Sequence, residues 1–344
     1  MTTGFEFLKN NGAQRVRNYD HQPLLLDDGI LEEEVSEEQS DLFYEHKKER
    51  WNAIDIRQSI PSADWPWRPQ RFIDGKDYGR TVAWLQTREG YPIPVRLAEI
   101  GATSFADQDS RLRREYETIE RVLSFVVNPF PWDEVESFAI ALQEQGFRLL
   151  PCLAKPSFSF EKMRRATQNR TKEAMDQLEK QALAWNNNLP TLVDGRLEPH
   201  MGAFNQHTDA VVGLIKTHYH TYLHQNGLRL LYELLPGERT PAFCLQKKLS
   251  VVSWYLRLNG QGEMPDWGLV RLEIPRNFFE EVINRDSSYL DYLSNIVYAY
   301  RCRGTSYKRA SISIYPVQRA EESLGALFTP LETLVQRFYR YTNL

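Results

Sequence analysis

The sequence contains few cysteines and no long apolar segment. Its 344 residues include only three cysteines, Cys152, Cys244 and Cys302, and no Cys-x-x-Cys pair. This usage argues against a zinc ribbon or a disulfide framework and is typical of a reducing cytoplasm. No segment approaches the ~20 apolar residues that span a bilayer, and the N-terminal MTTGFEFLKNNG lacks the basic-then-apolar layout of a secretory signal. We therefore expect a cytoplasmic protein with no membrane partner.

Several enzyme signatures are also missing. The sequence has no Walker A motif, which argues against ATP hydrolysis by the chain itself, and no Gly-x-Ser-x-Gly nucleophile elbow. His218, His220 and His224 are spaced as His-x-His-x-x-x-His, but no further ligand pattern accompanies them, so packing or surface histidines are favoured over a zinc site. The net charge of −4 counts mildly against a protein that coats DNA. It does not exclude a nuclease, because the carboxylates that hold metal ions are themselves acidic.

The pattern along the chain predicts one catalytic domain after a peripheral region. Residues 1–69 are the peripheral region, and their acidic stretch 27–41 is expected to be solvated. In residues 70–344, strand and helix patterns alternate, which favours a mixed α/β sheet. The expected strands are 71–74, 81–87 and 93–102, which would form an antiparallel meander, then 191–195, 251–258, 268–275 and 311–316. The expected helices are 107–124, 132–145, 161–187, two segments between 277 and 302, and the C-terminal segment, whereas 147–153 and 210–216 fit either a strand or a helix.

Two Asp-Gly pairs each follow an apolar strand pattern. They are Asp74 in FIDGKDYG and Asp194 in TLVDGRL. A carboxylate at the end of a strand projects from a rigid core and can share a metal ion with a carboxylate on a neighbouring strand, as two-metal phosphodiesterases require. Oxygen ligands of this kind suit Mg²⁺ and Mn²⁺. The alternative for either pair alone is an ordinary turn, because Asp-Gly is a favoured turn sequence.

A third carboxylate lies on the apolar side of the long predicted helix. Glu179 is four residues from both Met175 and Leu183, so it falls on the buried stripe, whereas Glu173 faces water. A carboxylate on an apolar face needs a partner. That partner is either a metal ion or a salt bridge.

The order of these motifs resembles the NurA family, a branch of the RNase H-like nucleases. FIDG, a helix with a glutamate and TLVDGRL are followed by AVVGLIKTH, SWYLRL, VRLEIP and SISIYPVQRAEES, so the resemblance runs from about residue 70 to about residue 328. It implies an RNase H-like mixed sheet flanked by helices. It also implies that Asp74, Glu179 and Asp194 hold Mn²⁺ or Mg²⁺, with supporting roles for Lys216 and Tyr315.

The resemblance further implies a metal-dependent DNA nuclease that works as a homodimer with a HerA-like hexameric ATPase. The expected roles are DNA end processing, repair or phage defence. One position departs from the family pattern, because Ser323 stands where a histidine is expected eight residues after Tyr315. Glu321 and Glu322 adjoin it, so a glutamate in a shifted helix is one possible substitute. The alternative function is a catalytically weak or inactive adaptor that regulates a HerA-like ATPase.

Two basic segments are candidates for DNA contacts. MRRATQNRTK (163–172) precedes Glu179, and YAYRCRGTSYKR (298–309) interleaves basic and aromatic residues. Basic side chains neutralise phosphates, and aromatic faces stack on unpaired bases. The alternative for each segment is a solvated helix face. The candidate residues are Arg164, Arg165, Arg170, Lys172, Arg301, Arg303, Lys308 and Arg309.

Overall fold

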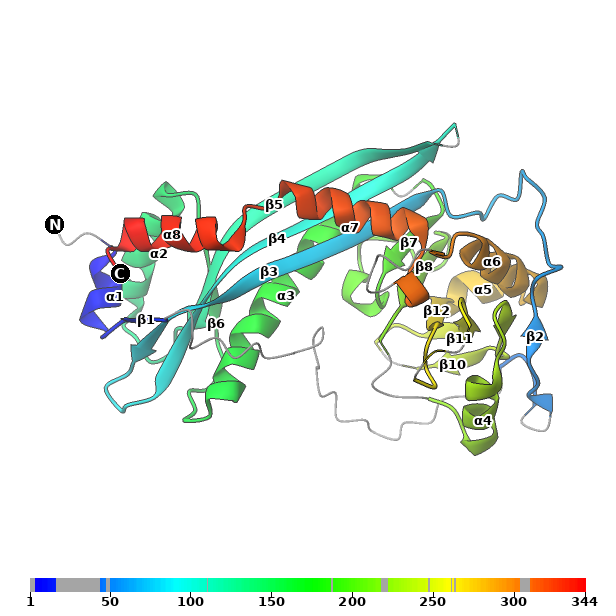
Figure 1. The fold of residues 1–344 in the computed structure, drawn as a ribbon, viewed down its shortest axis with the longest axis horizontal. Coiled ribbons are helices and arrows are strands. Elements are labelled where there is room, and N and C mark those ends of the chain that lie inside the picture. Colours follow the sequence, from blue (N-terminus) through cyan, green and yellow to red (C-terminus); the bar gives the residue numbers. More distant parts are fainter. Residues whose placement is uncertain are drawn as a thin grey trace.

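One long mixed sheet, flanked by helices, organises the chain (Figure 1). The computed structural model describes residues 4–16, 44–47, 50–109, 111–186, 188–217, 222–246, 248–260, 262, 264–303 and 310–344. The strands are β1 (Gln14–Arg15), β2 (Ile54–Asp55), β3 (Arg71–Gln86), β4 (Pro92–Gln108), β5 (Arg111–Val126), β6 (Arg148–Cys152), β7 (Thr191–Asp194), β8 (Val211–Ile215), β9 (Glu238–Arg239), β10 (Phe243–Leu245), β11 (Val251–Arg257) and β12 (Leu269–Pro275). The helices are α1 (Glu6–Asn10), α2 (Trp132–Glu144), α3 (Phe160–Trp185), α4 (Gln225–Glu233), α5 (Arg276–Glu281), α6 (Ser287–Ala299), α7 (Tyr315–Leu327) and α8 (Leu331–Thr342), with single 3-10 turns η3 (Glu198–His200) and η4 (Ala310–Ile312).

The strand order is that of the RNase H-like fold which the motif order implied. In the described residues the main path of the sheet is β2-β9-β11-β12-β8-β7-β3-β4-β5-β6. β3, β4 and β5 form the antiparallel meander, and β7 and β8 join on the side of β3 as parallel strands. A three-stranded meander extended beside its first strand by two parallel strands defines the RNase H-like sheet. The chain adds β12 and β11 beyond β8, both antiparallel.

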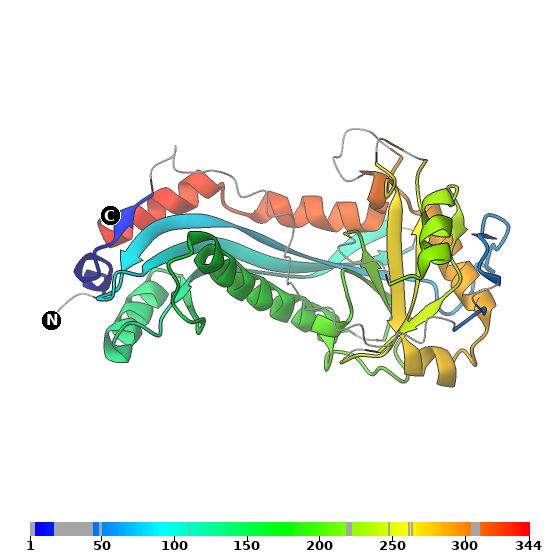
Figure 2. The same ribbon diagram turned by 90° about the horizontal axis from the view of Figure 1, so that it is seen from below.

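α3 and α7 cover opposite faces of the long strands (Figure 2). Side chains alternate between the two faces along a strand, and the neighbours of two β3 residues identify the faces. Ile73 packs in an apolar cluster with Met175 and Leu178 of α3. Phe72 packs in another cluster with Val317 of α7. We call these sides of the sheet the α3 face and the α7 face.

Three sequence-based expectations about secondary structure were wrong. Residues 107–124 form β5 rather than a helix, because pairing with β4 from Arg96–Ser124 to Gln108–Arg111 outweighs the weak helical preference of the charged residues. The expected strands 71–74 and 81–87 are two parts of the single strand β3. The segment 311–316 contributes one bridge, between Ile314 and Arg301, and the helix α7 begins at Tyr315. The structure confirms the expected helices 132–145 and 161–187 and the expected strands 191–195, 251–258 and 268–275. The two segments that fitted either a strand or a helix, 147–153 and 210–216, form strands.

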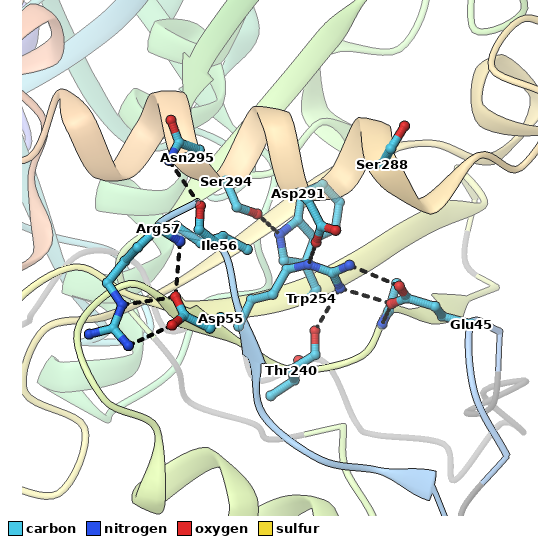
Figure 3. Close-up of polar contacts among 12 residues, drawn as sticks. Glu45, Asp55, Ile56, Arg57, Thr240, Trp254, Ser288, Asp291, Ser294 and Asn295 are labelled. Atoms are coloured by element: carbon cyan, nitrogen blue, oxygen red, sulfur yellow. Dashed lines mark hydrogen bonds and ion pairs between the residues drawn. The ribbon is translucent and has the colours of Figure 1, made fainter. Parts of the chain in front are cut away.

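The described parts of residues 1–69 join the sheet at two places. β1 pairs with β3, and β2 pairs with β9. Glu45 accepts two hydrogen bonds of 2.8 Å from Arg239, which also donates one of 2.7 Å to Asp291 on α6 (Figure 3). The backbone carbonyl of Ile56 accepts a bond of 2.9 Å from Asn295. The acidic stretch 27–41 lies outside the described residues, and none of the described helices combines the length and apolar character needed to span a bilayer.

Candidate active site

Asp74 lies inside β3, and the Asp-Gly pair there is not a turn. The strand continues through Gly75 and pairs with β4 on both sides of it. Alternation places Phe72, Asp74 and Lys76 on the α7 face. The Asp74 residue is 5% exposed, and its Oδ2 has no hydrogen-bond partner among the described residues. A buried carboxylate oxygen without a partner is unusual in a folded protein, so this atom is a candidate for ligand binding.

Asp194 lies beside Asp74 on the neighbouring parallel strand. Register pairs join Phe72 to Leu192 and Ile73 to Val193, so the next residues along, Asp74 and Asp194, point to the same face. β7 ends at Asp194, and Gly195 turns the chain away with a φ of 131°, a conformation that favours glycine. The two aspartates that the sequence singled out therefore stand on adjacent strands and on one side of the sheet.

Lys216 follows β8, the next parallel strand, and reaches the same place. Its Nζ donates a hydrogen bond of 2.7 Å to Asp194 Oδ2, and only 6% of its side chain is exposed. Burial alone would lower the pKa of Lys216, but Asp194 and Asp74 outweigh burial and raise it. Lys216 is therefore a buried ammonium held by carboxylates.

The same groups act on Asp74. Burial and the neighbouring Asp194 raise the pKa of Asp74 well above its usual range, and Lys216 partly offsets them. Glu179 and Glu321 raise it further. Strongly perturbed carboxylates that gather around one point are typical of functional sites, although structural ion-pair networks also produce them.

Glu179 approaches from the α3 face, with β3 between it and the Asp74 side chain. It is 3% exposed on the buried stripe of α3, as the sequence predicted. A Cβ built at Gly75 would lie 2.5 Å from Glu179 Oε1, so the missing side chain at position 75 is what lets the glutamate lie against the strand. The structure thus brings Glu179 next to the aspartates but on the other side of β3.

The partner of Glu179 is His200, a residue that the sequence gave no reason to select. Its Nε2 lies 3.1 Å from Glu179 Oε2, and its Nδ1 lies 3.0 Å from the carbonyl of Arg196. A carbonyl only accepts, so Nδ1 carries a proton and a second proton is shared between Nε2 and Oε2. Burial raises the pKa of Glu179; burial also opposes protonation of His200, but the bond to Glu179 outweighs it and raises the pKa of the imidazole.

Helix α7 separates the residues of the Tyr-Pro block. Tyr315 begins the helix and is 55% exposed, so its ring is not part of the buried cluster. Ser323 contacts Arg114 Nη1 at 3.4 Å across the α7 face of the meander. Glu321 acts electrostatically on both Asp74 and Lys216, whereas Glu322 is exposed and pairs with Arg319 at 3.1 Å. Of the two glutamates beside the missing histidine, Glu321 is the one at the carboxylate cluster.

The candidate DNA-binding residues lie apart from this cluster and many have local partners. On α3, Arg165 pairs with Glu161, Arg170 with Glu173 and Lys172 with Asp176, and Arg164 stacks over Trp84. They precede Glu179 by seven to fifteen residues, or roughly 10–22 Å along the helix. Arg301 stacks over Tyr298, Arg303 is exposed, and Lys308 and Arg309 lie outside the described residues.

The described residues contain no group of three His, Cys, Asp or Glu side chains arranged to hold one metal ion. At the cluster, Lys216 occupies Asp194 Oδ2, and Glu179 is engaged with His200. His224 accepts a bond of 3.1 Å from Gly227 N as the cap of α4, and His218 and His220 lie outside the described residues. Cys152, Cys244 and Cys302 are separate buried thiols.

Comparison with known proteins gives a likeness in structure only. No protein-family model matches the sequence, and no curated protein matches it. Among solved structures, the chain is similar to the crystal structure of the NurA nuclease from Sulfolobus solfataricus, with a TM-score of 0.37 and 14% sequence identity over 80% of this chain and 81% of that one. These values assign neither a family nor an activity, so function has to be argued from the site itself.

Proposed function

We propose that this protein is a metal-dependent DNA nuclease that hydrolyses phosphodiester bonds at Asp74 and Asp194. The observation that carries the proposal is the orphaned, buried Oδ2 of Asp74 beside a second carboxylate on the adjacent strand. Two carboxylates at this point are a donor set that suits Mg²⁺ or Mn²⁺. Such ions, when bound, lower the pKa of a water nucleophile and offset the charge that develops on the phosphate.

Each residue of the cluster has a role in this proposal. Asp74 and Asp194 supply rigid oxygen ligands, because both belong to paired strands and their backbones cannot shift independently. Glu179 lies against Gly75 on the α3 face and would be a third ligand only if its side chain reached around β3. Once its ammonium is released from Asp194, Lys216 is placed to neutralise a phosphate oxygen or to hold the attacking water. Tyr315 is exposed and would act on the DNA strand from the start of α7.

The motif order that resembles NurA supports a wider proposal about partners. We propose a homodimer that binds DNA and a HerA-like hexameric ATPase in end processing, repair or antiviral defence. The basic residues of α3 and of the segment after α6 would guide the DNA backbone, with a strong salt dependence of binding.

An adaptor without strong catalysis is the second candidate. Two observations favour it: the described residues present no preformed metal group, and Lys216 already neutralises Asp194. In that case the acidic cluster would be a structural remnant, and the protein would regulate its ATPase.

One experiment separates the two candidates. Asp194→Asn keeps the size of the side chain but removes the charge, so it should abolish Mn²⁺-dependent cleavage of labelled DNA. The protein should still fold and bind DNA, although the loss of the ion pair with Lys216 lowers its stability. Asp133→Asn, at an exposed site that starts α2, is the matched control and should cleave like the wild type. Cleavage that survives Asp194→Asn would contradict the site, and a wild type that is inactive with Mn²⁺ and the ATPase present would favour the adaptor.

A further inference from the structure

Carboxylates from three separate elements act on the ammonium of Lys216. Its ammonium is bonded to Asp194 of β7, and its pKa is raised by Asp74 of β3 and by Glu321 of α7 as well. The carboxylate oxygen that holds this ammonium is also the kind of ligand that divalent metal ions prefer. The position of the ammonium thus marks a cation position.

Backbone geometry places Glu321 on the correct side of α7 for this cluster. The helix buries Val317, Ala320 and Leu324 against the sheet, and Glu321 lies four residues after Val317 and three before Leu324. A Cβ built at Gly325 would lie 3.1 Å from Lys76 Nζ, so this turn of α7 contacts the β3 residue two positions after Asp74. α7 begins on the side toward β7 and β8 (Figure 1), and Glu321 stands one helical turn before Gly325 in that direction.

Contacts with the neighbouring strand β4 fix the same orientation of α7. Lys76 pairs with Gly101 of β4, and a Cβ at Gly101 would meet the side chains of Leu324 and Phe328 at 3.1 and 3.0 Å. α7 is therefore held against β3 and β4 just after the glutamate, which limits how far the helix can turn. Glu322, the next residue, points outward and pairs with Arg319 and Gln318.

We propose that Asp74, Asp194 and Glu321 form a cation cradle that Lys216 fills in the metal-free protein, and that a divalent cation binds by displacing the Lys216 ammonium. The proposal rests on the nuclease function above and assigns the place of the missing histidine to Glu321. In the metal-free protein the ammonium neutralises the cradle and occupies Asp194 Oδ2. The unpartnered Asp74 Oδ2 is the ligand atom that the ammonium leaves unused.

Displacement has a consequence that catalysis by Lys216 alone does not have. If the ammonium and the metal ion compete for the same oxygens, removing the ammonium must strengthen metal binding and weaken the metal-free fold. If Lys216 serves only substrate, its removal leaves metal affinity unchanged. Metal binding measured without DNA therefore distinguishes the two.

The test uses Lys216→Met, which keeps the length of the chain and removes the charge, with exposed Lys162→Met as control. Mn²⁺ binding is measured by titration calorimetry, and thermal unfolding is followed with and without Mn²⁺. Lys216→Met should bind Mn²⁺ about tenfold or more tightly than the wild type. Its Tm should be lower without metal and should rise more on adding Mn²⁺, because a ligand that binds the native state more tightly stabilises it more. Lys162→Met should match the wild type in both measurements.

A second pair of variants keeps the test decisive if Lys216→Met does not fold. Glu321→Gln should weaken Mn²⁺ binding about tenfold, whereas Glu322→Gln should not change it. Equal Mn²⁺ affinity in wild type and Lys216→Met, or in wild type and Glu321→Gln, would overturn the cradle. DNA cleavage reports separately on the nuclease: an active wild type with unchanged affinity in these variants refutes only the cradle. If Lys216→Met binds Mn²⁺ more tightly but the wild type never cleaves DNA, only the nuclease function is refuted. If neither the wild type nor any variant binds Mn²⁺, both the nuclease function and the cradle are refuted.

Discussion

Asp74 and Glu99 are both buried carboxylates on the α7 face of the meander, and their surroundings differ completely. Glu99 on β4 is 1% exposed and accepts hydrogen bonds from Arg121 Nε at 2.9 Å, Thr329 N at 2.5 Å and Thr329 Oγ1 at 2.7 Å. Asp74 is 5% exposed, and its Oδ2 has no partner among the described residues. Glu99 fixes the start of α8 to the sheet, whereas Asp74 fixes nothing through that oxygen.

The contrast separates a structural carboxylate from a functional candidate in this chain. Burying a charge without partners is strongly unfavourable, so a fully bonded carboxylate is explained by the fold and an under-bonded one is not. Glu45 accepts hydrogen bonds from Arg239 and Ala242 N, so it belongs to the structural class with Glu99. Glu179 lies between the extremes, because His200 satisfies one of its oxygens. Mutations of the two classes should therefore change different measurements.

The largest effect is expected at Asp74. Asp74→Asn removes a ligand charge from the proposed centre and should reduce Mn²⁺-dependent cleavage by ~10³-fold or more. The free energy of unfolding should stay the same or increase, because the amide relieves the repulsion with Asp194. Nuclease rates and urea unfolding measured on one preparation would check both parts.

A loss of stability in Asp74→Asn would break the comparison. It would mean that the carboxylate has a structural partner and belongs with Glu99. Full activity in a stably folded Asp74→Asn would remove Asp74 from the site.

Glu99 should show the reverse pattern. Glu99→Ala leaves Arg121 and the two Thr329 donors without their acceptor, and should lower the free energy of unfolding by about 2–3 kcal/mol. This loss is smaller than for a fully buried ion pair because Arg121 is 39% exposed. Urea unfolding measures the loss, and cleavage at low temperature should persist. Glu117→Ala, which breaks an exposed pair with Arg114, should change stability by less than ~0.5 kcal/mol.

His200 tests the intermediate case. His200→Ala leaves Glu179 buried against Gly75 without its hydrogen-bond partner, so stability should fall by about 1–2 kcal/mol. If Glu179 is a ligand that His200 orients, Mn²⁺ affinity should also fall about 10–100-fold. Calorimetry without DNA separates the two effects: a stability loss with unchanged Mn²⁺ affinity would place Glu179 with Glu99 as a structural residue.

Much of the fold could be predicted because local signals and tertiary structure agree. The long helix α3, the strands β7, β11 and β12 and the buried stripe around Glu179 follow directly from apolar spacing. The third meander strand could not be recognised, since the Arg- and Glu-rich sequence of β5 has a helix-like pattern that pairing with β4 overrides. Likewise, Asp74-Gly75 has the sequence of a turn, but its neighbours pair with β4 throughout.

The site was predictable where it depends on strand ends and not where it depends on long-range contacts. Asp194 and Lys216 follow apolar strands that lie side by side, and parallel strands bring such ends to one edge. His200 comes from a short 3-10 turn with no pattern of its own, and reaches Glu179 only because α3 packs there. The sequence identified Glu321 and Glu322 together. Only Glu321 shares the helix side of Val317 and Leu324, and the packing of α7 on Lys76 and Gly101 brings that side to the sheet.

The smallest expected effect concerns Glu45, the structural carboxylate that ties the N-terminal region to Arg239. Burial alone would raise the pKa of Glu45, but its hydrogen bonds to Arg239 outweigh burial and lower it below the ordinary value of 4.5. A carboxylate whose pKa is lower in the folded state stabilises the fold above the unfolded pKa and loses that contribution as the pH falls through the folded value.

Glu45→Gln should therefore be less stable than the wild type by about 1 kcal/mol near pH 7, with the difference shrinking below pH ~4.5. Urea unfolding of both proteins between pH 3 and pH 7 measures this convergence, and cleavage near pH 7 should be unchanged. A stability difference that is independent of pH would show that packing, and not the charge of Glu45, holds this segment, and a loss of cleavage would place a fully bonded carboxylate in the functional class.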